Sequence, residues 1–225
     1  MKIVCVRIGD LYDSRYEEYI ESKLPEHEIV WVREPMQPNI NLQWNKLFGM
    51  TLDVDEPVCV MDIDVLLIND YKKVFDYPIK RGQFLAAPGW WRDMPLEAKD
   101  RFTINGGFQK YYPKDVKYIY DKFMKQPEYW QTHYVKEGWA SPPFYGEQHF
   151  IEDSVNEKLE LVKLPNSWVT RFNEDLLYHL TLKYTQACGN LYLLNDDGFH
   201  KDLKFVHFAA KGNFPHKWDK YEQYK

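Results

Sequence analysis

The stretch of sequence that decides the fold is Val58-Cys59-Val60-Met61-Asp62-Ile63-Asp64-Val65-Leu66-Leu67. Four apolar residues after Pro57 predict a buried strand, two carboxylates follow, and a second apolar run begins at once. Because side chains alternate between the faces of a strand, Asp62 and Asp64 are expected to point the same way. Two converging carboxylates at the end of a buried strand are costly unless a cation lies between them. Oxygen ligands suit Mg²⁺ or Mn²⁺, so the stretch indicates a metal-dependent enzyme with a phosphorylated substrate.

The alternative interpretation is a turn at the end of a strand, in which Asp62 caps the segment that follows. Asp-x-Asp arises about once by chance in a chain of this length and acidity, and it occurs again at Asp53-Val54-Asp55. That second copy is followed by Glu56-Pro57 and has no apolar run before it, which is typical of a solvated turn. The strand context therefore separates the two copies.

Length and composition describe an ordinary globular protein. The chain has 225 residues, 44% of them hydrophobic and 28% charged, which suffices for one large domain or two small ones. Its net charge of −5, with both signs mixed along the chain, does not favour a nucleic-acid partner. No apolar run approaches the roughly 18 residues that a transmembrane helix needs.

The cysteines and the N-terminus predict a reducing compartment, and we expect a cytoplasmic protein. Cys5, Cys59 and Cys188 show no metal-binding spacing, and the first two lie in apolar strands, where a buried free thiol is expected. The sequence enters a predicted strand at residue 2 without a signal peptide.

Aromatic residues are in excess, at 17% of the chain. Most are expected in the core, but flat apolar rings are also what carbohydrate-binding surfaces present to sugars. Five of them fall in predicted loops, and we hypothesise that some form a platform for an acceptor sugar: Trp90, Trp91, Trp139, Phe144 and Tyr145.

The order of predicted elements indicates an α/β fold. Strands are predicted over 2–8, 29–32 and 58–61, separated by helices over 15–23 and 41–51, with Ser14 and Glu17 as a capping box for the first helix. This order is typical of a parallel sheet that binds ligands at the carboxyl ends of its strands. Later strands are predicted over 84–87, 104–108, 159–164 and 204–208, and later helices over 114–125 and from residue 147. No linker or repeat interrupts the pattern, which predicts a single domain over 1–225.

Several ordered motifs resemble those of the glycogenin-like and lipopolysaccharide-galactosyltransferase-like retaining glycosyltransferases. The resemblance spans about residues 2–218 and implies a Rossmann-like A-type glycosyltransferase domain with a mostly parallel central sheet flanked by helices. The motifs that carry it are Trp44-Asn45-Lys46-Leu47, Met61-Asp62-Ile63-Asp64-Val65-Leu66-Leu67, Ile68-Asn69-Asp70 through Val74-Phe75, Ala86-Ala87-Pro88, Ile104-Asn105-Gly106-Gly107-Phe108, Gly146-Glu147-Gln148 and Val206-His207-Phe208.

The chain departs from the family pattern at two points. Glu147 stands where the family has an aspartate, which keeps the charge on a longer arm. After His207 the family places a glycine and then a phosphate-binding lysine. This chain has Ala210 at the glycine position, and Lys211 and Lys217 are both candidates for the lysine.

The resemblance implies that Asp62, Asp64 and His207 bind Mn²⁺ (or Mg²⁺) and that the ion bridges the two phosphates of a nucleotide sugar. For His207 the alternative is a hydrogen-bonded strand histidine. Residues implied in donor binding are Val6, Arg7, Ile8, Asp10, Tyr12, Lys46, Ile63, Asn105, Gly106 and Lys211 or Lys217.

Specific roles follow for some of these residues. Tyr12 is expected to stack on the base, although it could equally pack against a helix, and Asp10 to accept a hydrogen bond from the nucleoside. The lysines are expected to neutralise phosphate charge, the alternative being solvated surface lysines. Glu147 and Gln148 are implied beside the anomeric carbon as catalytic residues, the alternative being an ordinary helix N-terminus.

The sequence therefore predicts a metal-dependent glycosyltransferase that moves a hexose from a UDP-sugar, such as UDP-glucose, to a carbohydrate acceptor with retention. One rival is a sugar nucleotidyltransferase, which normally has a Gly-rich loop with Arg or Lys after its first strand. Gly9-Asp10-Leu11-Tyr12 is not such a loop. The other rival is a non-catalytic carbohydrate-binding module, which would leave the carboxylate pair without a purpose.

Overall fold

The computed structural model describes residues 1–89, 102–140, 146–172, 202–208, 215–217 and 221–224. The chain divides into two compact units, which are treated separately. The first comprises Met1–Ile63, Pro78–Ala87 and Glu97–Lys163, and the second comprises Asp64–Tyr77, Pro88–Leu96 and Leu164–Lys225.

A six-stranded sheet forms the first unit, with the strand order β2-β1-β3-β6-β5-β7. β1 pairs in parallel with β2 and β3, and β5 with β7, whereas β6 runs antiparallel to β3. The predicted α/β fold with a mostly parallel sheet is confirmed. The strands are β1 (Lys2–Val6), β2 (Glu28–Val32), β3 (Val58–Met61), β5 (Gln83–Pro88), β6 (Ile104–Tyr111) and β7 (Glu160–Lys163).

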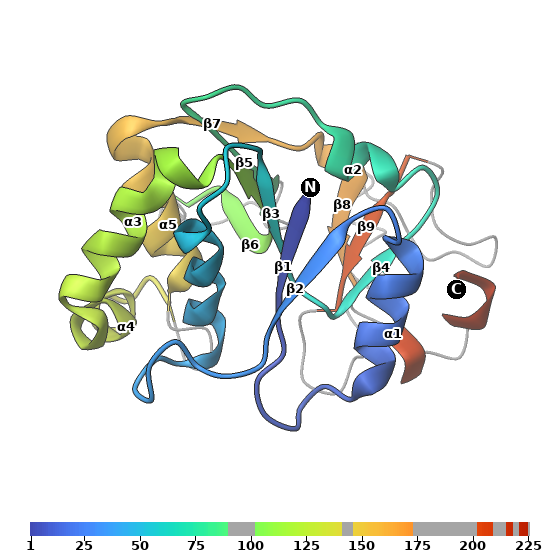
Figure 1. Cartoon of the computed structure of the whole chain (residues 1–225), viewed down its shortest axis with the longest axis horizontal. Coiled ribbons are helices and arrows are strands. Elements are labelled where there is room, and N and C mark those ends of the chain that lie inside the picture. The colour runs from blue at the N-terminus through green and yellow to red at the C-terminus, as the bar shows by residue number, and fades with distance from the viewer. Residues whose placement is uncertain (90–101, 141–145, 173–201, 209–214, 218–220, 225) are drawn as a thin grey trace. The chain divides into compact units, whose positions relative to one another are not determined.

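Helices cover both faces of this sheet. In Figure 1, the 3₁₀ helix η1 and the helices α3 and α5 lie on one side of β1 and β3, and α1 lies on the other. On the η1 side, Val4 and Val60 of the sheet pack with Trp44, which stacks on Phe123 at a ring distance of 4.8 Å. The helical elements of this unit are α1 (Ser14–Lys23), η1 (Leu42–Thr51), α3 (Pro113–Lys125), α4 (Pro127–Lys136) and α5 (Glu147–Lys158).

The start of α1 differs from the sequence prediction. Asp13, not Ser14, is the N-cap, because its side chain accepts a hydrogen bond from the Arg15 amide at 3.0 Å. The predicted capping box of Ser14 and Glu17 is therefore wrong, although the helix begins one residue from the predicted position. Glu17 instead accepts hydrogen bonds from Arg7 and Arg33.

The second unit contains a three-stranded sheet with the order β4-β9-β8. β4 and β9 are antiparallel, and β8 and β9 are parallel. β9 lies within the strand predicted over 204–208, whereas β4 and β8 were not predicted, because three residues are too few to display an alternating pattern. The elements are β4 (Val65–Leu67), α2 (Lys72–Asp76), η2 (Asn166–Trp168), β8 (Val169–Arg171), β9 (Phe205–His207), η3 (Pro215–Lys217) and η4 (Tyr221–Tyr224).

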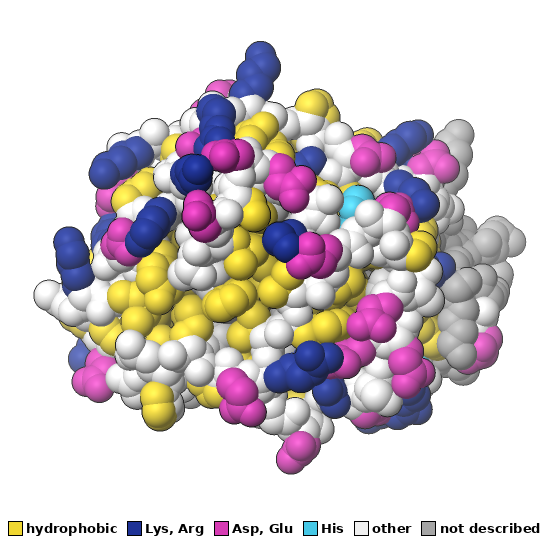
Figure 2. All heavy atoms as spheres, viewed as in Figure 1, with side chains coloured by type: hydrophobic (Ala, Val, Ile, Leu, Met, Phe, Trp, Pro, Cys, Tyr) yellow, Lys and Arg dark blue, Asp and Glu magenta, His cyan; other side chains and the backbone are white. Residues whose placement is uncertain are grey.

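The predictions about the charged surface, the second Asp-x-Asp copy and two of the cysteines are confirmed. Figure 2 shows basic and acidic side chains intermixed over the face in view. Asp53 and Asp55 are exposed, and Asp55 lies 2.7 Å from the Lys114 ammonium, so the second Asp-x-Asp copy is a solvated turn. Cys5 and Cys59 are buried free thiols, and Cys188 lies outside the described residues.

Among the described residues we find no helix with both the length and the apolar character that crossing a bilayer requires.

Candidate active site

Lys46 is the centre of a buried polar cluster in the first unit. It projects from η1 and is only 8% exposed. Its ammonium nitrogen lies 2.6 Å from a carboxylate oxygen of Asp62 and donates a hydrogen bond to the Gly106 carbonyl at 3.1 Å. Asp62 directly follows β3, and its amide donates to the Gly107 carbonyl at 2.9 Å. The buried ammonium group of Lys46 thus lies between the end of β3 and the start of β6.

The start of β6 is held by side-chain amides. The Gly106 amide donates to the Gln148 side-chain carbonyl at 3.2 Å, and the Gly107 amide donates to the Asn105 side-chain carbonyl at 2.8 Å. A β-carbon on Gly106 would lie 2.9 Å from a Glu147 carboxyl oxygen and 3.6 Å from the Lys46 nitrogen. Within the first unit, the space beside Gly106 is therefore occupied by the Glu147 carboxyl group and the Lys46 ammonium.

Glu147 is a buried acid with an unusual pKa. The side chain is 4% exposed, and burial raises its pKa from 4.5 to about 7. The Lys46 ammonium opposes this shift, the Asp62 charge adds to it, and a hydrogen bond from Gln109 to Glu147 at 3.4 Å opposes it. Acids with pKa values displaced toward neutrality by burial are common at catalytic sites.

The start of α5, which carries Glu147 and Gln148, is fixed by Gly146. This residue has a φ of 80°, and an added β-carbon would lie 2.5 Å from the Tyr134 β-carbon. The left-handed backbone and the close contact both require glycine here.

Gly146→Ala is therefore expected to lower the free energy of unfolding by about 3 kcal/mol, the sum of an overpacking cost and a left-handed backbone cost. Urea unfolding measures the change. Gly138→Ala is the matched control, because its φ is 77° but nothing lies within 4 Å of an added β-carbon. The control should lose only the left-handed backbone cost of about 1 kcal/mol, and equal losses in the two variants would contradict the packing argument.

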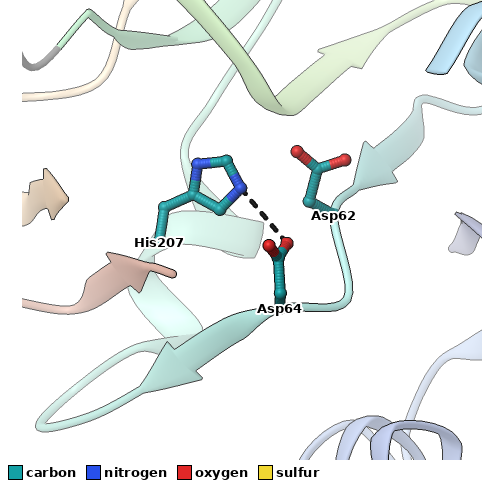
Figure 3. Close-up of side chains that lie close together, drawn as sticks. All are labelled: Asp62, Asp64 and His207. Atoms are coloured by element: carbon teal, nitrogen blue, oxygen red, sulfur yellow. Dashed lines mark hydrogen bonds and ion pairs between the residues drawn. The ribbon is translucent and has the colours of Figure 1, made fainter. Parts of the chain in front are cut away.

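A second pair of polar side chains, Asp64 and His207, lies in the other unit. Asp64 directly precedes β4. Because Val65 of β4 pairs with His207 of β9, Asp64 lies next to His207. Figure 3 shows the imidazole of His207 turned toward the Asp64 carboxylate, at 3.2 Å from Nε2 to Oδ1, with Asp62 drawn as the third side chain. Asp64 and His207 are 7% and 5% exposed. The boundary between the units follows Ile63, which is itself buried.

The predicted nucleotide-binding residues lie at and beyond the end of β1. Arg7 donates to the Tyr12 carbonyl at 2.9 Å and to Glu17 of α1 at 3.0 Å, so it ties the following loop to the helix. Val6 and Ile8 are partly buried, and Asp10 is exposed. The Tyr12 ring makes an edge contact with Tyr16 at 4.9 Å, the helix-packing alternative that the sequence left open.

The remaining predicted residues are not gathered into these clusters. Lys217 is exposed in η3, and Trp139 packs edge-on against Phe102 at 5.7 Å, partly buried at the edge of the core. The others lie outside the described residues: Lys211, Trp90, Trp91, Phe144 and Tyr145.

Sequence reasoning missed two polar residues of the first unit. Gln109 is 1% exposed and donates to Glu147, and Glu152 is 3% exposed on α5. Gln109 directly follows the strand predicted over 104–108, and Glu152 lies in the helix predicted from residue 147. Neither residue stands inside an apolar run, since Lys110 follows Gln109 and Asp153 follows Glu152, so the sequence carries no local signal of their burial.

Comparison with known proteins places this geometry in a structural context. No family model matches the sequence, and no curated protein matches it. The galactosyltransferase LgtC, solved with donor and acceptor sugar analogs, aligns with a TM-score of 0.60 at 12% identity over 100% of this chain and 94% of LgtC. The glycosyltransferase GlyE of Streptococcus pneumoniae TIGR4 aligns with a TM-score of 0.55 at 11% identity over 95% of this chain and 56% of GlyE.

A third solved structure is a glycosyltransferase involved in glycosylation of the major capsid of PBCV-1. It aligns with a TM-score of 0.52 at 11% identity, over 93% of this chain and 94% of that chain. At such identities the similarity establishes the fold, and the chain therefore has the A-type glycosyltransferase fold.

Proposed function

We propose that residues 1–225 form one nucleotide-sugar glycosyltransferase domain that transfers a hexose from a UDP-sugar to a carbohydrate acceptor with retention. The observation that carries the proposal is the buried cluster of Lys46, Asp62, Gly106 and Glu147. It combines the Lys46 ammonium, two acids and a glycine that the Lys46 and Glu147 side chains approach closely, on the fold of known glycosyltransferases. Buried charge of this kind is costly to stability and is typical of a site selected for chemistry.

We further propose that Asp62, Asp64 and His207 hold a divalent cation, Mn²⁺ or Mg²⁺. The residues fit such an ion, because carboxylate and imidazole ligands suit Mn²⁺. Asp62 and Asp64 are separated by one residue, and His207 contacts Asp64 in a buried position where a carboxylate needs a compensating charge. When bound, the ion would supply Lewis-acid stabilisation to the leaving diphosphate.

The protein's own residues then have distinct proposed roles. Lys46 supplies a positive charge to the diphosphate, and Asn105 and Gly106 line the donor sugar. Glu147 supplies a carboxyl group and Gln148 an amide beside the anomeric carbon, where positive charge develops during transfer. The residues after β1, including Asp10 and Tyr12, bind the uridine, and the buried thiols support a reducing, cytoplasmic location.

Calorimetry with UDP in the presence and absence of Mn²⁺ tests the proposal. We expect UDP to bind only with the metal, and a panel of UDP-sugars to identify a donor whose hydrolysis or transfer is followed by NMR. CDP and GDP are matched controls for the base. UDP binding that is absent, or that does not change with the metal, would overturn the proposed function.

A further inference from the structure

Glu152 forms a buried attachment between α5 and the start of β6. Its two carboxyl oxygens accept hydrogen bonds from the Thr103 amide at 3.0 and 2.8 Å and from the Ile104 amide at 3.2 Å. The Thr103 hydroxyl also donates to Glu152, at 2.6 Å. Three donors from two consecutive residues therefore converge on one side chain that is 3% exposed.

Gln148 makes a second attachment one helical turn earlier. It lies four residues before Glu152, and side chains with this spacing share one face of a helix. Its side-chain carbonyl accepts from the Gly106 amide at 3.2 Å and from the Asn105 side-chain amide at 3.5 Å. The same face of α5 is thus bonded to β6 at Thr103–Ile104 and again at Asn105–Gly106.

Two attachments one turn apart restrict α5 more than either attachment does alone. Core packing of Phe150, Ile151 and Val155 holds α5 without strong directional preference, whereas hydrogen bonds at two points specify its position along β6. With both contacts, the first turn of α5 keeps one register against the glycines of β6. Glu147, adjacent to Gln148, depends on that register, since its carboxyl oxygen lies against Gly106 where no β-carbon would fit.

We propose that Glu152 is a positioning residue, which sets the placement of Glu147 and Gln148 against Asn105 and Gly106. This inference rests on the proposed function, because it assigns a catalytic purpose to the placement. Glu152 lies more than a full helical turn from Glu147, and within the described residues it is linked to Glu147 and Gln148 through α5 and to Asn105 and Gly106 through β6.

Glu152→Gln is the principal test, because it keeps the size of the side chain while one accepting oxygen becomes a donor that faces amide donors. We expect kcat for donor hydrolysis or transfer to fall about 10-fold or more, with KM for the UDP-sugar within about twofold, because a small misplacement costs rate more than binding. Glu157→Gln is the matched control, on the same helix but half-exposed and paired with Lys122. A second pair tests the hydroxyl: Thr103→Val is expected to lower kcat, and Thr103→Ser to restore it.

Hydrogen exchange of the metal-free protein gives a readout independent of turnover. We expect faster exchange of the amides over 103–107 and 147–151 in Glu152→Gln but not in Glu157→Gln. If the wild type turns over no nucleotide sugar, the proposed function fails, and the exchange pattern alone decides whether Glu152 holds α5 to β6. The positioning role would be overturned by unchanged exchange in these segments. It would also be overturned by a Glu152→Gln variant that keeps the wild-type kcat, whether or not its KM is raised.

Discussion

Asp64→Ala is expected to abolish Mn²⁺-dependent UDP binding and to lower sugar transfer at least ~100-fold. The variant removes one of the two carboxylates proposed to hold the cation, and the charge of that cation would compensate the leaving diphosphate. It also removes the partner of His207, whose Nε2 lies 3.2 Å from the Asp64 carboxylate. The measurement is calorimetry with UDP and Mn²⁺, followed by a turnover assay with the best donor.

Two further variants separate metal binding from folding. Asp64→Asn keeps the shape of the side chain and an oxygen facing His207 but removes the negative charge, so it should lose metal-dependent binding while keeping its unfolding midpoint. Asp53→Ala, in the exposed Asp-x-Asp copy, should behave as the wild type, because Asp53 contacts only the solvated Lys114 at 3.9 Å among the ion pairs of the described residues. The metal site is wrong if Asp64→Asn binds UDP with the metal dependence of the wild type.

The sequence predicted most elements of the first unit because their patterns are local. The apolar run of Val58–Met61 marks β3, and Pro113 marks the start of α3 at the expected place. Lys46 and Gly106 were identified from the resemblance, and the structure joins Lys46 both to Gly106 and to Asp62. Each identification needed only a short window of residues or an ordered motif.

What the sequence did not predict depends on contacts between distant segments. The second sheet joins β4 to β9, which lie about 140 positions apart, and each strand has only three residues. β6 was predicted as a strand, but its antiparallel direction is a property of pairing with β3 rather than of its own residues. α4 was not predicted although Pro127 marks its start as Pro113 marks that of α3, because a single residue separates the two helices and no loop signals a new element. Glu152 acquires its role only through Thr103, 49 positions away.

Glu147→Gln is the second large expected effect, and it concerns stability as a function of pH. The pKa of Glu147 is raised to about 7 from an ordinary 4.5, chiefly by burial. At pH values below the ordinary pKa of 4.5, the Glu147 carboxyl group is protonated in both the folded and the unfolded chain and does not lower the free energy of unfolding. As the pH rises toward 7 the unfolded chain releases its proton while the folded chain retains it, so folding loses stability until the folded group also ionises.

The loss amounts to about 3 kcal/mol at pH values above 7, since each pKa unit corresponds to about 1.4 kcal/mol. Glutamine does not titrate, so the free energy of unfolding of Glu147→Gln, relative to that of the wild type, should rise by about this amount between pH ~4.5 and pH ~8. Urea unfolding of the metal-free proteins measures it, with Glu157→Gln as the exposed control. The same variant should lose most of its sugar transfer, because it lacks the carboxyl group that we propose lies beside the anomeric carbon. The stability cost of the buried acid would then be the cost of its catalytic role. A stability difference that is equal at both pH values would show that Glu147 titrates normally and carries no such cost.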